Sequence, residues 1–475
     1  MDASTHYDYD TRPALSQKGL ARVTHALAIW LPSDRDGGAV ADWDAAQWAA
    51  AEWVAYWQNA VPWLAKRIAD TNAPVPADVL ARLMALAADC RERTRRMLNA
   101  AAEMFEAFDR LGIEAIPLKG AVLAPLYYDD PSLRPMGDID VLIAPERLGE
   151  AGQVMRDLGY RFYSRSDEDE VYLRGEYKPN MWAPDNVHPI ELHFRLREEY
   201  AGLIYDLAPA MWRGSQRQGY WGGTQARVPA PSVLLHHVCA HATSDWIVQR
   251  GRLMHLDDVR RLAARMTEGD WQAFSAGVPA EGARYVYPML YWARDMARAA
   301  VPDEVLARLR ADSPPALRDW AERIDLASTS IVNPAMRSGI GFEIIDRLAR
   351  SPRERLHMLW RSVFPRRWNL TKRYPRLIAT PFWPLCYLLL NVDRLGHVIC
   401  IGGGVGIAAA HPVAKAFRAA GNNVIGIIGA KNVQLLFYED EMRAACTELI
   451  VTTDDGSRGS PQKRFGLLLK PLVDG

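Results

Sequence analysis

The stretch RPMGDIDVLIAPE, residues 134–146, places Asp138 and Asp140 one residue apart at the start of an apolar run. The run predicts a strand from about residue 139 to residue 143. Side chains at positions i and i+2 of a strand lie on one face, about 7 Å apart along the strand. Paired carboxylates there suit a divalent cation, above all Mg²⁺, which prefers oxygen ligands. A turn that uses both acids for capping is the alternative interpretation.

A third carboxylate is expected on a second strand, HPIELHFRL at residues 188–196. Apolar and polar residues alternate in it, with Ile190, Leu192 and Phe194 on one face and Glu191, His193 and Arg195 on the other. Glu191 is the natural candidate for the third acid because it lies on the polar face. Three carboxylates could hold two metal ions, one at the attacking oxygen and one at the leaving group.

The composition is that of a globular protein without an obvious cofactor framework. A chain of 475 residues is expected to form two or three domains, and a formal net charge of zero predicts no nucleic-acid partner. The five cysteines form no CxxC pair, which argues against a zinc ribbon, an iron–sulfur cluster or a disulfide scaffold. The N-terminus lacks the apolar core of a secretory signal, so a cytoplasmic location is expected. The longest apolar run, residues 377–392, falls short of roughly 20 residues and contains two prolines, so no transmembrane segment is expected.

Changes of pattern along the chain predict four regions. They are a helical region at 1–110, a core with the acidic strands at 111–230, a second helical region at 231–395 and a glycine-rich α/β module at 396–475. Residues 75–112 are expected to form one long amphipathic helix or two, ending at Gly112. Residues 350–376 hold nine Arg or Lys residues against one acid. A solvated basic face is favoured there, and contact with an anionic polymer or a membrane surface is the alternative.

The run LGIEAIPLKGAVLAPLYYDDPSLRPMGDIDVLIAPERLGEAGQVMRDLGY resembles the uncharacterised nucleotidyltransferase family of the DNA polymerase β-like superfamily. IELHFRL and PSVLLHHVCAHATSDW extend the resemblance, which covers roughly residues 20 to 390. It implies an α+β fold in which a nucleotidyltransferase-type mixed sheet is flanked by helices. It also implies Asp138, Asp140 and Glu191 as catalytic metal ligands, and a nucleoside triphosphate as phosphate donor.

One departure from the wider superfamily lies at the turn that grips the triphosphate. A glycine–serine pair is usual there, whereas this chain has Lys119 and Gly120. Lys119 could meet phosphate oxygens as a point charge, and Gly120 allows close backbone approach. Gly137 leaves the backbone free at the strand entry, and Arg134 is a further candidate for phosphate contact. An exposed turn lysine and a structural arginine are the alternatives.

Three histidines in the later helical part, His236, His237 and His241, invite a metal interpretation. No HExxH motif accompanies them, and the family resemblance puts this segment in a helix packed behind the site. A structural role is therefore favoured.

The tail ICIGGGVGIAAAHPVAKAFRAAGNNVIGIIGAKN, with LLFYEDEM and ELIVTTDDGSRG, predicts a strand, a glycine turn, a helix and a strand. It resembles the NAD(P)-binding half of ferredoxin–NADP reductase-like electron-transfer subunits. The resemblance implies NAD(P) as the ligand of Gly402, Gly403, Gly404, Gly406, Asp454 and Asp455. The flavin-binding barrel of those proteins is not visible, and Lys431 stands where a ribose-binding acid is expected. A relic or a structural role is favoured over retained nucleotide affinity.

These features together predict a metal-dependent nucleotidyltransferase that uses Mg²⁺ or Mn²⁺, with a partial Rossmann-like module after it. The acceptor stays open among a protein, an RNA end, a sugar and a small molecule. One alternative is an oxidoreductase or electron-transfer subunit that uses the tail, which predicts a bound flavin. The other is a nucleotide-binding protein without catalysis.

Overall fold

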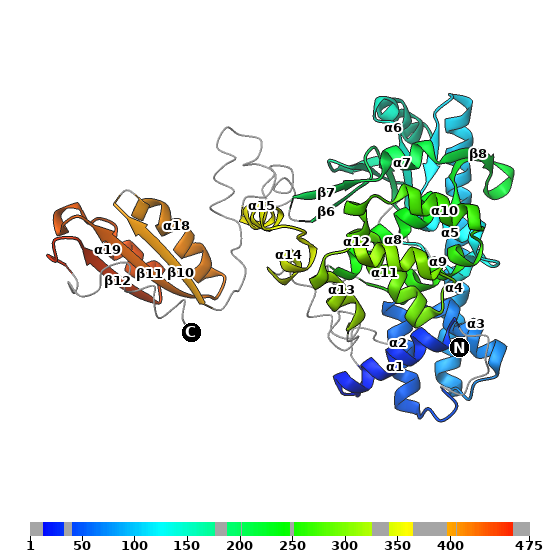
Figure 1. The fold of residues 1–475 in the computed structure, drawn as a ribbon, viewed down its shortest axis with the longest axis horizontal. Helices are drawn as coiled ribbons and strands as arrows, with labels where there is room; N and C mark the ends of the chain where they lie inside the picture. Colours follow the sequence, from blue (N-terminus) through cyan, green and yellow to red (C-terminus); the bar gives the residue numbers. More distant parts are fainter. Residues whose placement is uncertain are drawn as a thin grey trace. The chain divides into compact units, whose positions relative to one another are not determined.

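The computed structural model describes residues 13–32, 40–175, 188–200, 202–247, 251–324, 342–363, 397–404 and 406–458. The chain divides into two compact units, Met1–Leu359 and Trp360–Gly475 (Figure 1). Helices and mixed strands make the larger unit α+β, and the smaller one is a parallel α/β unit. The fold class expected from the sequence is confirmed.

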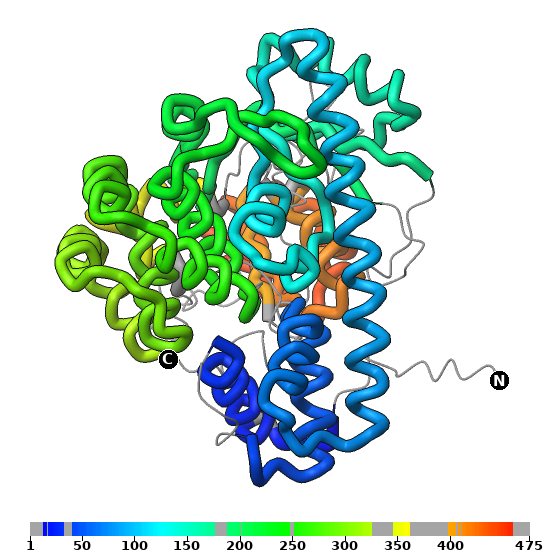
Figure 2. Tube along the Cα trace, turned by 90° about the vertical axis from the view of Figure 1, so that its right-hand side faces the viewer, coloured from blue at the N-terminus to red at the C-terminus, as the bar shows by residue number. Residues whose placement is uncertain are grey.

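Four helices open the larger unit: α1 (Gln17–Trp30), α2 (Ala45–Trp57), α3 (Val61–Thr71) and α4 (Ala77–Arg110). Ser16 caps α1, and Asp44 forms a capping box with Gln47 at the start of α2. The long amphipathic stretch is one helix of 34 residues rather than two. The chain leaves α4 through Gly112, whose φ of 62° a side chain would disfavour. In Figure 2, α4 runs from α2 and α3 to the opposite end of the unit, where it contacts α6.

A five-stranded sheet follows, in the order β1-β2-β5-β4-β3. Its strands are β1 (Ala115–Pro117), β2 (Ile139–Ile143), β3 (Arg161–Arg165), β4 (Asp169–Leu173) and β5 (Ile190–His193). β2 and β5 are parallel neighbours, and the other pairs are antiparallel. β2 has the predicted bounds, whereas β5 ends at His193, so Phe194 and Arg195 lie beyond the strand. This part of the chain also contains four helical elements, which are α5 (Lys119–Tyr127), η1 (Pro131–Leu133), η2 (Pro145–Arg147) and α6 (Leu148–Asp157).

The remaining elements of the larger unit are mostly helical. Two short hairpins, β6 (Arg197–Tyr200) with β7 (Leu203–Asp206) and β8 (Ser215–Gly219) with β9 (Gln225–Pro229), enclose α7 (Ala208–Arg213) and η3 (Trp221–Gly223). Then follow α8 (Pro231–Ile247), α9 (Leu253–Ala264), α10 (Glu268–Gly277), η4 (Ala280–Gly282), α11 (Ala283–Ala297), α12 (Asp303–Asp312), α13 (Pro315–Glu322), α14 (Phe342–Leu348) and α15 (Pro352–Val363).

The two faces of the sheet enter different hydrophobic clusters. Ile139, Val141, Ile143, Ile190 and Leu192 belong to the cluster that also contains the buried residues of α4. Leu142 of β2 belongs to the other cluster, together with Ala240 of α8. Because side chains alternate along a strand, Asp140 lies on the face of Leu142, and Glu191 and His193 lie on the same face of β5. The polar side chains of both strands therefore lie on the face of Leu142, whose cluster includes Ala240 and Ile247 of α8, while other residues of α8 belong to the first cluster.

The smaller unit has a three-stranded parallel sheet, β10-β11-β12. Its elements are β10 (His397–Gly403), α18 (Gly406–Ala419), β11 (Asn423–Ala430), η9 (Val433–Leu435), α19 (Glu439–Ala445) and β12 (Glu448–Thr453). The predicted strand, glycine turn, helix and strand are present. Alternate residues of the sheet pack on α18 and α19, as in Cys400, Val424 and Ile428 against Ala414 and Met442.

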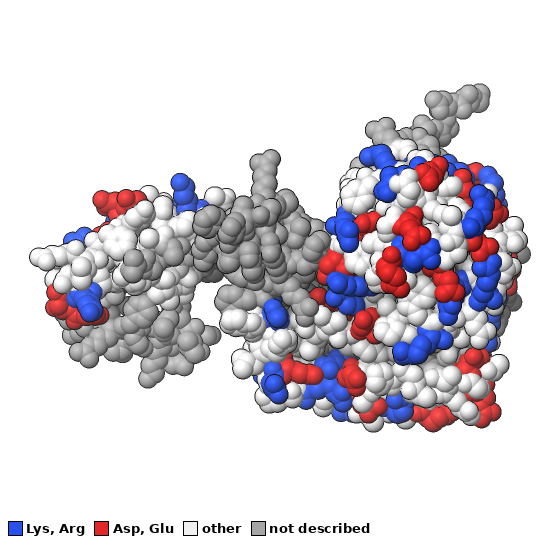
Figure 3. All heavy atoms as spheres, turned by 90° about the horizontal axis from the view of Figure 1, so that it is seen from above, with Lys and Arg blue, Asp and Glu red and all other residues white. Residues whose placement is uncertain are grey.

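Charged side chains of both signs are interspersed on the face of the larger unit seen in Figure 3. Within the predicted basic segment, Glu354 pairs with Arg284 at 2.9 Å and Arg355 with Asp346 at 2.8 Å. Residues 364–376 of that segment, and the apolar run at 377–392, lie outside the described residues. None of the helices that the structure describes combines the length and the apolar character needed to cross a bilayer.

Candidate active site

Asp140 is the centre of a compact polar cluster on β2 and β5. Its Cα is the register partner of Glu191 on the parallel strand, and its side chain is 2% exposed. The oxygen Oδ1 accepts a hydrogen bond from Lys119 Nζ at 2.9 Å and lies 2.9 Å from His193 Nε2. A buried carboxylate thus meets two nitrogen groups that can carry positive charge.

His193 joins the two acids as a possible metal ligand. One ligand atom each from Asp140, Glu191 and His193 lies within 4.8 Å of the other two, and His193 Nε2 is 3.6 Å from Glu191 Oε2. The donor set, carboxylate oxygens with one imidazole nitrogen, fits a divalent cation. The alternating pattern predicts His193 on the polar face of its strand, and the sequence alone did not mark it as a ligand. The two-residue spacing from Glu191 was the signal that could have done so.

Asp138 lies just before β2 and is half-buried. It lines the same pocket as Asp140, and its charge acts on Lys119 and Glu191. Burial, and then the charge of Asp140, raise the pKa of Asp138. The charges of Asp138, Asp140 and Glu191 therefore act on one another. The three ligand atoms that lie within 4.8 Å of one another, however, come from Asp140, Glu191 and His193, and not from Asp138.

The pKa values of Asp140 and Glu191 shift in opposite directions, because Lys119 and His193 stabilise the charged form of Asp140 while burial and the other carboxylates disfavour that of Glu191. Burial acts to raise the pKa of Asp140, but the charge of Lys119 and the hydrogen bond with His193 outweigh it and hold that pKa below its ordinary value. Burial, and then the charges of Asp140 and Asp138, raise the pKa of Glu191 to about 7. Burial acts to lower the pKa of Lys119, yet the charges of Asp140 and Asp138 raise it, so the side chain is an ammonium.

Lys119 is the first residue of α5, and its side chain reaches this cluster. Lys119 has a φ of 45°, a left-handed conformation that is uncommon for a residue with a side chain. Gly120 follows it where there is no room for a Cβ, which would stand 2.6 Å from Met136 Cγ and 2.7 Å from Arg134 Nη1. The backbone of α5 thus packs tightly on the RPMGD segment. The expected close approach of a phosphate to Gly120 stays a prediction.

Arg134 is held by an acid that the sequence analysis did not connect with it. Its Nη2 lies 3.0 Å and its Nε 3.2 Å from the two carboxylate oxygens of Asp258, on α9. Tyr128 donates a 2.7 Å hydrogen bond to the same carboxylate, and Arg134 Nη1 donates to the Pro135 carbonyl. Arg134 is buried, and its guanidinium joins the loop before β2 to α9. Its contact with a phosphate stays a prediction.

A pocket of about 560 Å³ opens beside the cluster. From the sheet side it is lined by Lys119, Gly120, Arg134, Gly137, Asp138 and Asp140, and from the helical side by His241, Asp245, Arg252, His255 and Asp258. Trp57 and Gln58, at the end of α2, also line it. Its volume is in the range of small-molecule sites. Every sequence-predicted residue of the larger unit except Glu191 thus lines this pocket, and Glu191 is adjacent through Asp140.

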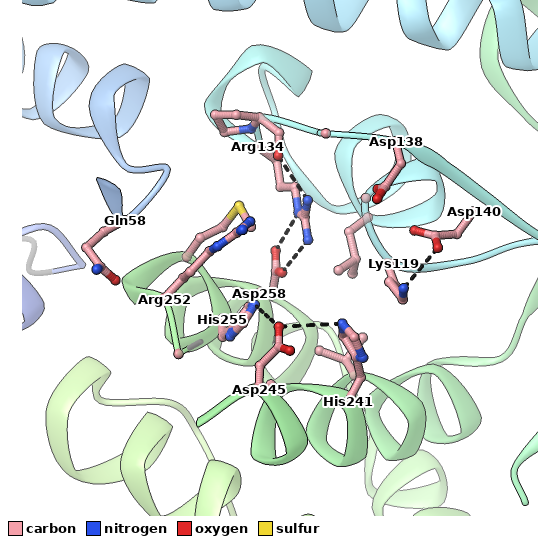
Figure 4. Close-up of a pocket in the computed structure, with 18 of the residues that line it drawn as sticks. Gln58, Lys119, Arg134, Asp138, Asp140, His241, Asp245, Arg252, His255 and Asp258 are labelled. Carbon is pink, nitrogen blue, oxygen red and sulfur yellow. Dashed lines mark hydrogen bonds and ion pairs between the residues drawn. The ribbon is translucent and has the colours of Figure 1, made fainter. Parts of the chain in front are cut away.

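The position of His241 corrects the sequence analysis. The helix that carries His236, His237 and His241 was expected behind the site, yet His241 lines the pocket (Figure 4). His236 and His237 are buried, as a structural role predicts. His236 lies five positions before His241 and faces a different direction, whereas His237 lies four positions before it, one helical turn away, with the two ring centroids 6.3 Å apart.

The glycines of the tail lie at the end of β10 and the start of α18. Gly404 has a φ of 51°, and Gly402 and Gly403 are the last residues of the strand. Gly406 begins α18. Asp455 accepts hydrogen bonds from the backbone and hydroxyl of Ser457, at 2.9 and 2.6 Å, and so stabilises its own turn. Asp454 follows β12 in the same turn. A glycine turn that enters a helix is the arrangement expected of a dinucleotide module.

Comparison with curated proteins finds short partial relatives. The dihydroorotate dehydrogenase B (NAD(+)) electron transfer subunit homolog of Thermotoga maritima is 41% identical over 69 residues, 14% of this chain and 24% of that protein. The electron transfer subunit of Streptococcus thermophilus is 41% identical over 61 residues, 13% of this chain and 23% of that protein. The chain thus spans about a quarter of the length of these relatives.

Among solved structures, the antibiotic-resistance factor ANT(2'')-Ia matches 38% of this chain and 91% of its own, at 16% identity and a TM-score of 0.26. A family described as uncharacterised nucleotidyltransferase matches residues 44–310. Both resemblances drawn from the sequence are confirmed. Because the family match spans more than half of the 475 residues, the chain belongs to the uncharacterised nucleotidyltransferases.

Proposed function

We propose that this protein transfers a nucleotidyl group from a nucleoside triphosphate to a hydroxyl acceptor, with the help of a divalent metal. The observation that carries the proposal is the double role of Asp140. It belongs both to the group of three ligand atoms within 4.8 Å and to the wall of the pocket. A metal held there stands next to the space in which a triphosphate would lie.

Asp140, Glu191 and His193 would hold one metal ion, and Asp138 would complete a second position at the pocket wall. When bound, a divalent cation supplies charge neutralisation at the phosphates and polarises the reacting phosphorus. The nitrogen of His193 favours a transition-metal ion such as Mn²⁺, because Mg²⁺ takes oxygen ligands. Mg²⁺ and Mn²⁺ are therefore the two ions to compare.

Side chains of this protein would bind and orient the triphosphate. Lys119 carries an ammonium beside Asp140 and lines the pocket, so it can form a point-charge contact with a phosphate oxygen. The reaction joins the acceptor oxygen to the α-phosphorus and expels pyrophosphate. Holding both reactants in line is the main contribution of such a site, since positioning and electrostatics dominate phosphoryl and nucleotidyl transfer.

The test is nucleotidyl transfer from labelled triphosphates. Each of the four NTPs, labelled at the α-phosphate, is incubated with the protein, Mg²⁺ or Mn²⁺, and a crude cell extract that supplies acceptors. The label is expected in one class of acceptor and pyrophosphate in solution. Asp138→Asn and Asp140→Asn are expected to abolish labelling while circular dichroism stays unchanged. Labelling that persists in either variant would reject the metal-ligand assignment.

A second candidate concerns the tail alone. The turn from Gly404 into α18, with the partial similarity to NAD(+)-linked electron transfer subunits, favours nucleotide binding there. NADH titration followed by fluorescence tests this binding, and an absorption spectrum of the purified protein tests for a flavin. A flavin spectrum would favour the electron-transfer alternative, whereas NADH affinity without flavin would leave a binding module.

A further inference from the structure

A second group of titratable side chains lines the pocket opposite Asp138 and Asp140 (Figure 4). His241 and Asp245 lie one helical turn apart on α8, and His255 comes from α9. Asp245 Oδ2 is 3.8 Å from His241 Nε2 and 3.8 Å from His255 Nε2. We refer to these three residues as the histidine wall.

The histidine wall faces the polar side of the sheet for a structural reason. Asp140 lies on the face of β2 that also presents Leu142, and Leu142 shares a hydrophobic cluster with Ala240 of α8. His241 follows Ala240 directly and turns to the pocket. The carboxylates of Asp138 and Asp140 and the ring of His241 therefore line the same pocket from opposite sides.

His241 has the environment of a proton acceptor. Its Nδ1 is 3.6 Å from Glu198 Oε1, on β6, and its Nε2 is 3.8 Å from Asp245 Oδ2. Both distances exceed hydrogen-bonding range, so neither nitrogen is hydrogen-bonded within the described residues. The side chain is 29% exposed, so a ligand in the pocket can reach it. Two carboxylates at opposite edges of the ring would stabilise the imidazolium that forms when the ring takes a proton.

The other histidines of this region are less suited to the task. His255 Nδ1 is buried without a hydrogen-bond partner, and burial, with Arg252, His241, Arg134 and Lys119 around the ring, holds its pKa well below the ordinary value. His237 is 1% exposed, and both of its nitrogens are buried without a partner. His237 offers no accessible nitrogen to a reactant in the pocket, and burial disfavours the protonated form of His255, whereas His241 is the most exposed of the three rings.

We infer that His241 removes the proton from the acceptor hydroxyl, with Asp245 and Glu198 as positioning residues. The inference rests on the proposed nucleotidyl transfer. The acceptor O–H bond breaks as its proton passes to a ring nitrogen of His241, and the released electron pair forms the bond to the α-phosphorus. The bond from the α-phosphorus to its bridging oxygen breaks, and pyrophosphate leaves with that pair. The imidazolium then returns its proton to the solvent.

The experiment uses the full chain, the NTP that wild type turns over fastest, Mn²⁺, and glycerol as the probe hydroxyl. Pyrophosphate release is measured for wild type and for His241→Ala, with and without added imidazole. General-base removal is expected to slow release about 10²–10⁴-fold. Imidazole is expected to restore part of the rate, because it can occupy the space of the missing ring, while the affinity for the NTP stays that of wild type.

Three outcomes overturn the inference. They are a rate for His241→Ala within threefold of wild type, a loss that imidazole does not restore, and a loss explained by weaker NTP binding. In each of these cases wild type still releases pyrophosphate, so the proposed function stands. Absence of pyrophosphate release by wild type with every NTP, with glycerol and with the cell extract alike, rejects the proposed function and the inference with it.

Two variants serve as controls for the same assay. His25→Ala removes an exposed histidine on α1 and is expected to leave the rate unchanged. Asp245→Asn keeps the shape of the histidine wall but removes a charge beside His241. It is expected to lower the rate by less than His241→Ala does, and imidazole is expected to leave the rate of this variant unchanged. A thermal melt of each variant separates these effects from unfolding.

Discussion

Lys119 places one ammonium among three acids, and its side chain is 23% exposed. Lys119→Met removes this cation and leaves Asp140 with less compensation. Loss of one partner of a buried pair typically destabilises a protein by about 3–5 kcal/mol. Urea denaturation is expected to show a loss of this size, and Mn²⁺ is expected to raise the melting temperature of the variant more than that of wild type, because the metal replaces the missing charge.

Lys66→Met is the matched control for this variant. Lys66 pairs with Asp70 at 2.8 Å, but the two side chains are 52% and 47% exposed. An exposed pair contributes about 0–1 kcal/mol, so this variant should be close to wild type and indifferent to Mn²⁺. Equal effects of Mn²⁺ on the two variants would contradict a metal site next to Lys119.

Gly120 and Gly149 offer a contrast between a crowded and an open glycine. A Cβ at Gly120 would stand 2.6 Å from Met136 Cγ, whereas nothing lies within 4 Å of one at Gly149, on α6. Gly120→Ala is expected to cost about 1–3 kcal/mol through overpacking. Gly149→Ala is expected to gain up to about 1 kcal/mol through helix propensity. Urea denaturation measures both, and a neutral Gly120→Ala would contradict the close approach.

Among single residues, the sequence predicted those whose position follows from the two-residue repeat of a strand. Asp138, Asp140 and Glu191 could be selected because alternation places side chains on known faces. Arg134 could not be interpreted in the same way, since its partner Asp258 is 124 residues away. His241 was misplaced for a related reason: which side of a helix faces the pocket depends on its packing against other elements.

Among elements, the pair of Arg134 and Asp258 joins the loop that carries Asp138 to α9, which forms part of the opposite pocket wall. Arg134→Met and Asp258→Leu are each expected to lose about 3–5 kcal/mol, because each strands a buried charge. The double variant is expected to lose clearly less than the sum, since both charges are gone. Urea denaturation of the four proteins gives the coupling, and losses that add within about 0.5 kcal/mol would show that the two side chains act independently.

The bounds of helices and strands match the sequence expectation where an apolar run or a glycine stop marks them. β2 has the expected span, and Gly112 stands directly after α4 as a helix stop. β5 is shorter than its alternating pattern because the chain turns after His193, toward β6. The alternation of Phe194 and Arg195 continued the strand pattern by coincidence, and only the pairing with β2 and β4 sets its end.

For the whole molecule, buried neutral histidines predict a loss of stability in acid. His236 is 4% exposed and its Nε2 lies 2.6 Å from the Tyr205 hydroxyl. Burial, with the charge of Arg308, lowers the pKa of His236 from 6.5 to about 4. Between these two values the unfolded chain binds more protons than the fold, so the free energy of unfolding falls as the pH drops below about 6.5. This residue alone accounts for about 3 kcal/mol by pH 4.

The variant His236→Gln tests this contribution. It is expected to flatten the decline of the free energy of unfolding between pH 7 and 4 by up to about 3 kcal/mol, measured by urea denaturation at each pH. His25→Gln, at an exposed position, should keep the wild-type slope. His237 and His255 act in the same direction as His236, because burial holds their pKa values well below the ordinary one as well. An unchanged slope in His236→Gln would mean that His236 is already protonated in the fold.

Trp57 gives the pocket an optical reporter. It lines the pocket from the end of α2, whereas the catalytic candidates come from β2, β5 and α8. Its emission should therefore respond when a nucleotide fills the space, without any dye or label. The chain has 16 tryptophans, so the difference spectrum between wild type and Trp57→Phe isolates this one. The same signal, followed in a stopped-flow instrument, would time the arrival and departure of substrate before any acceptor has been identified.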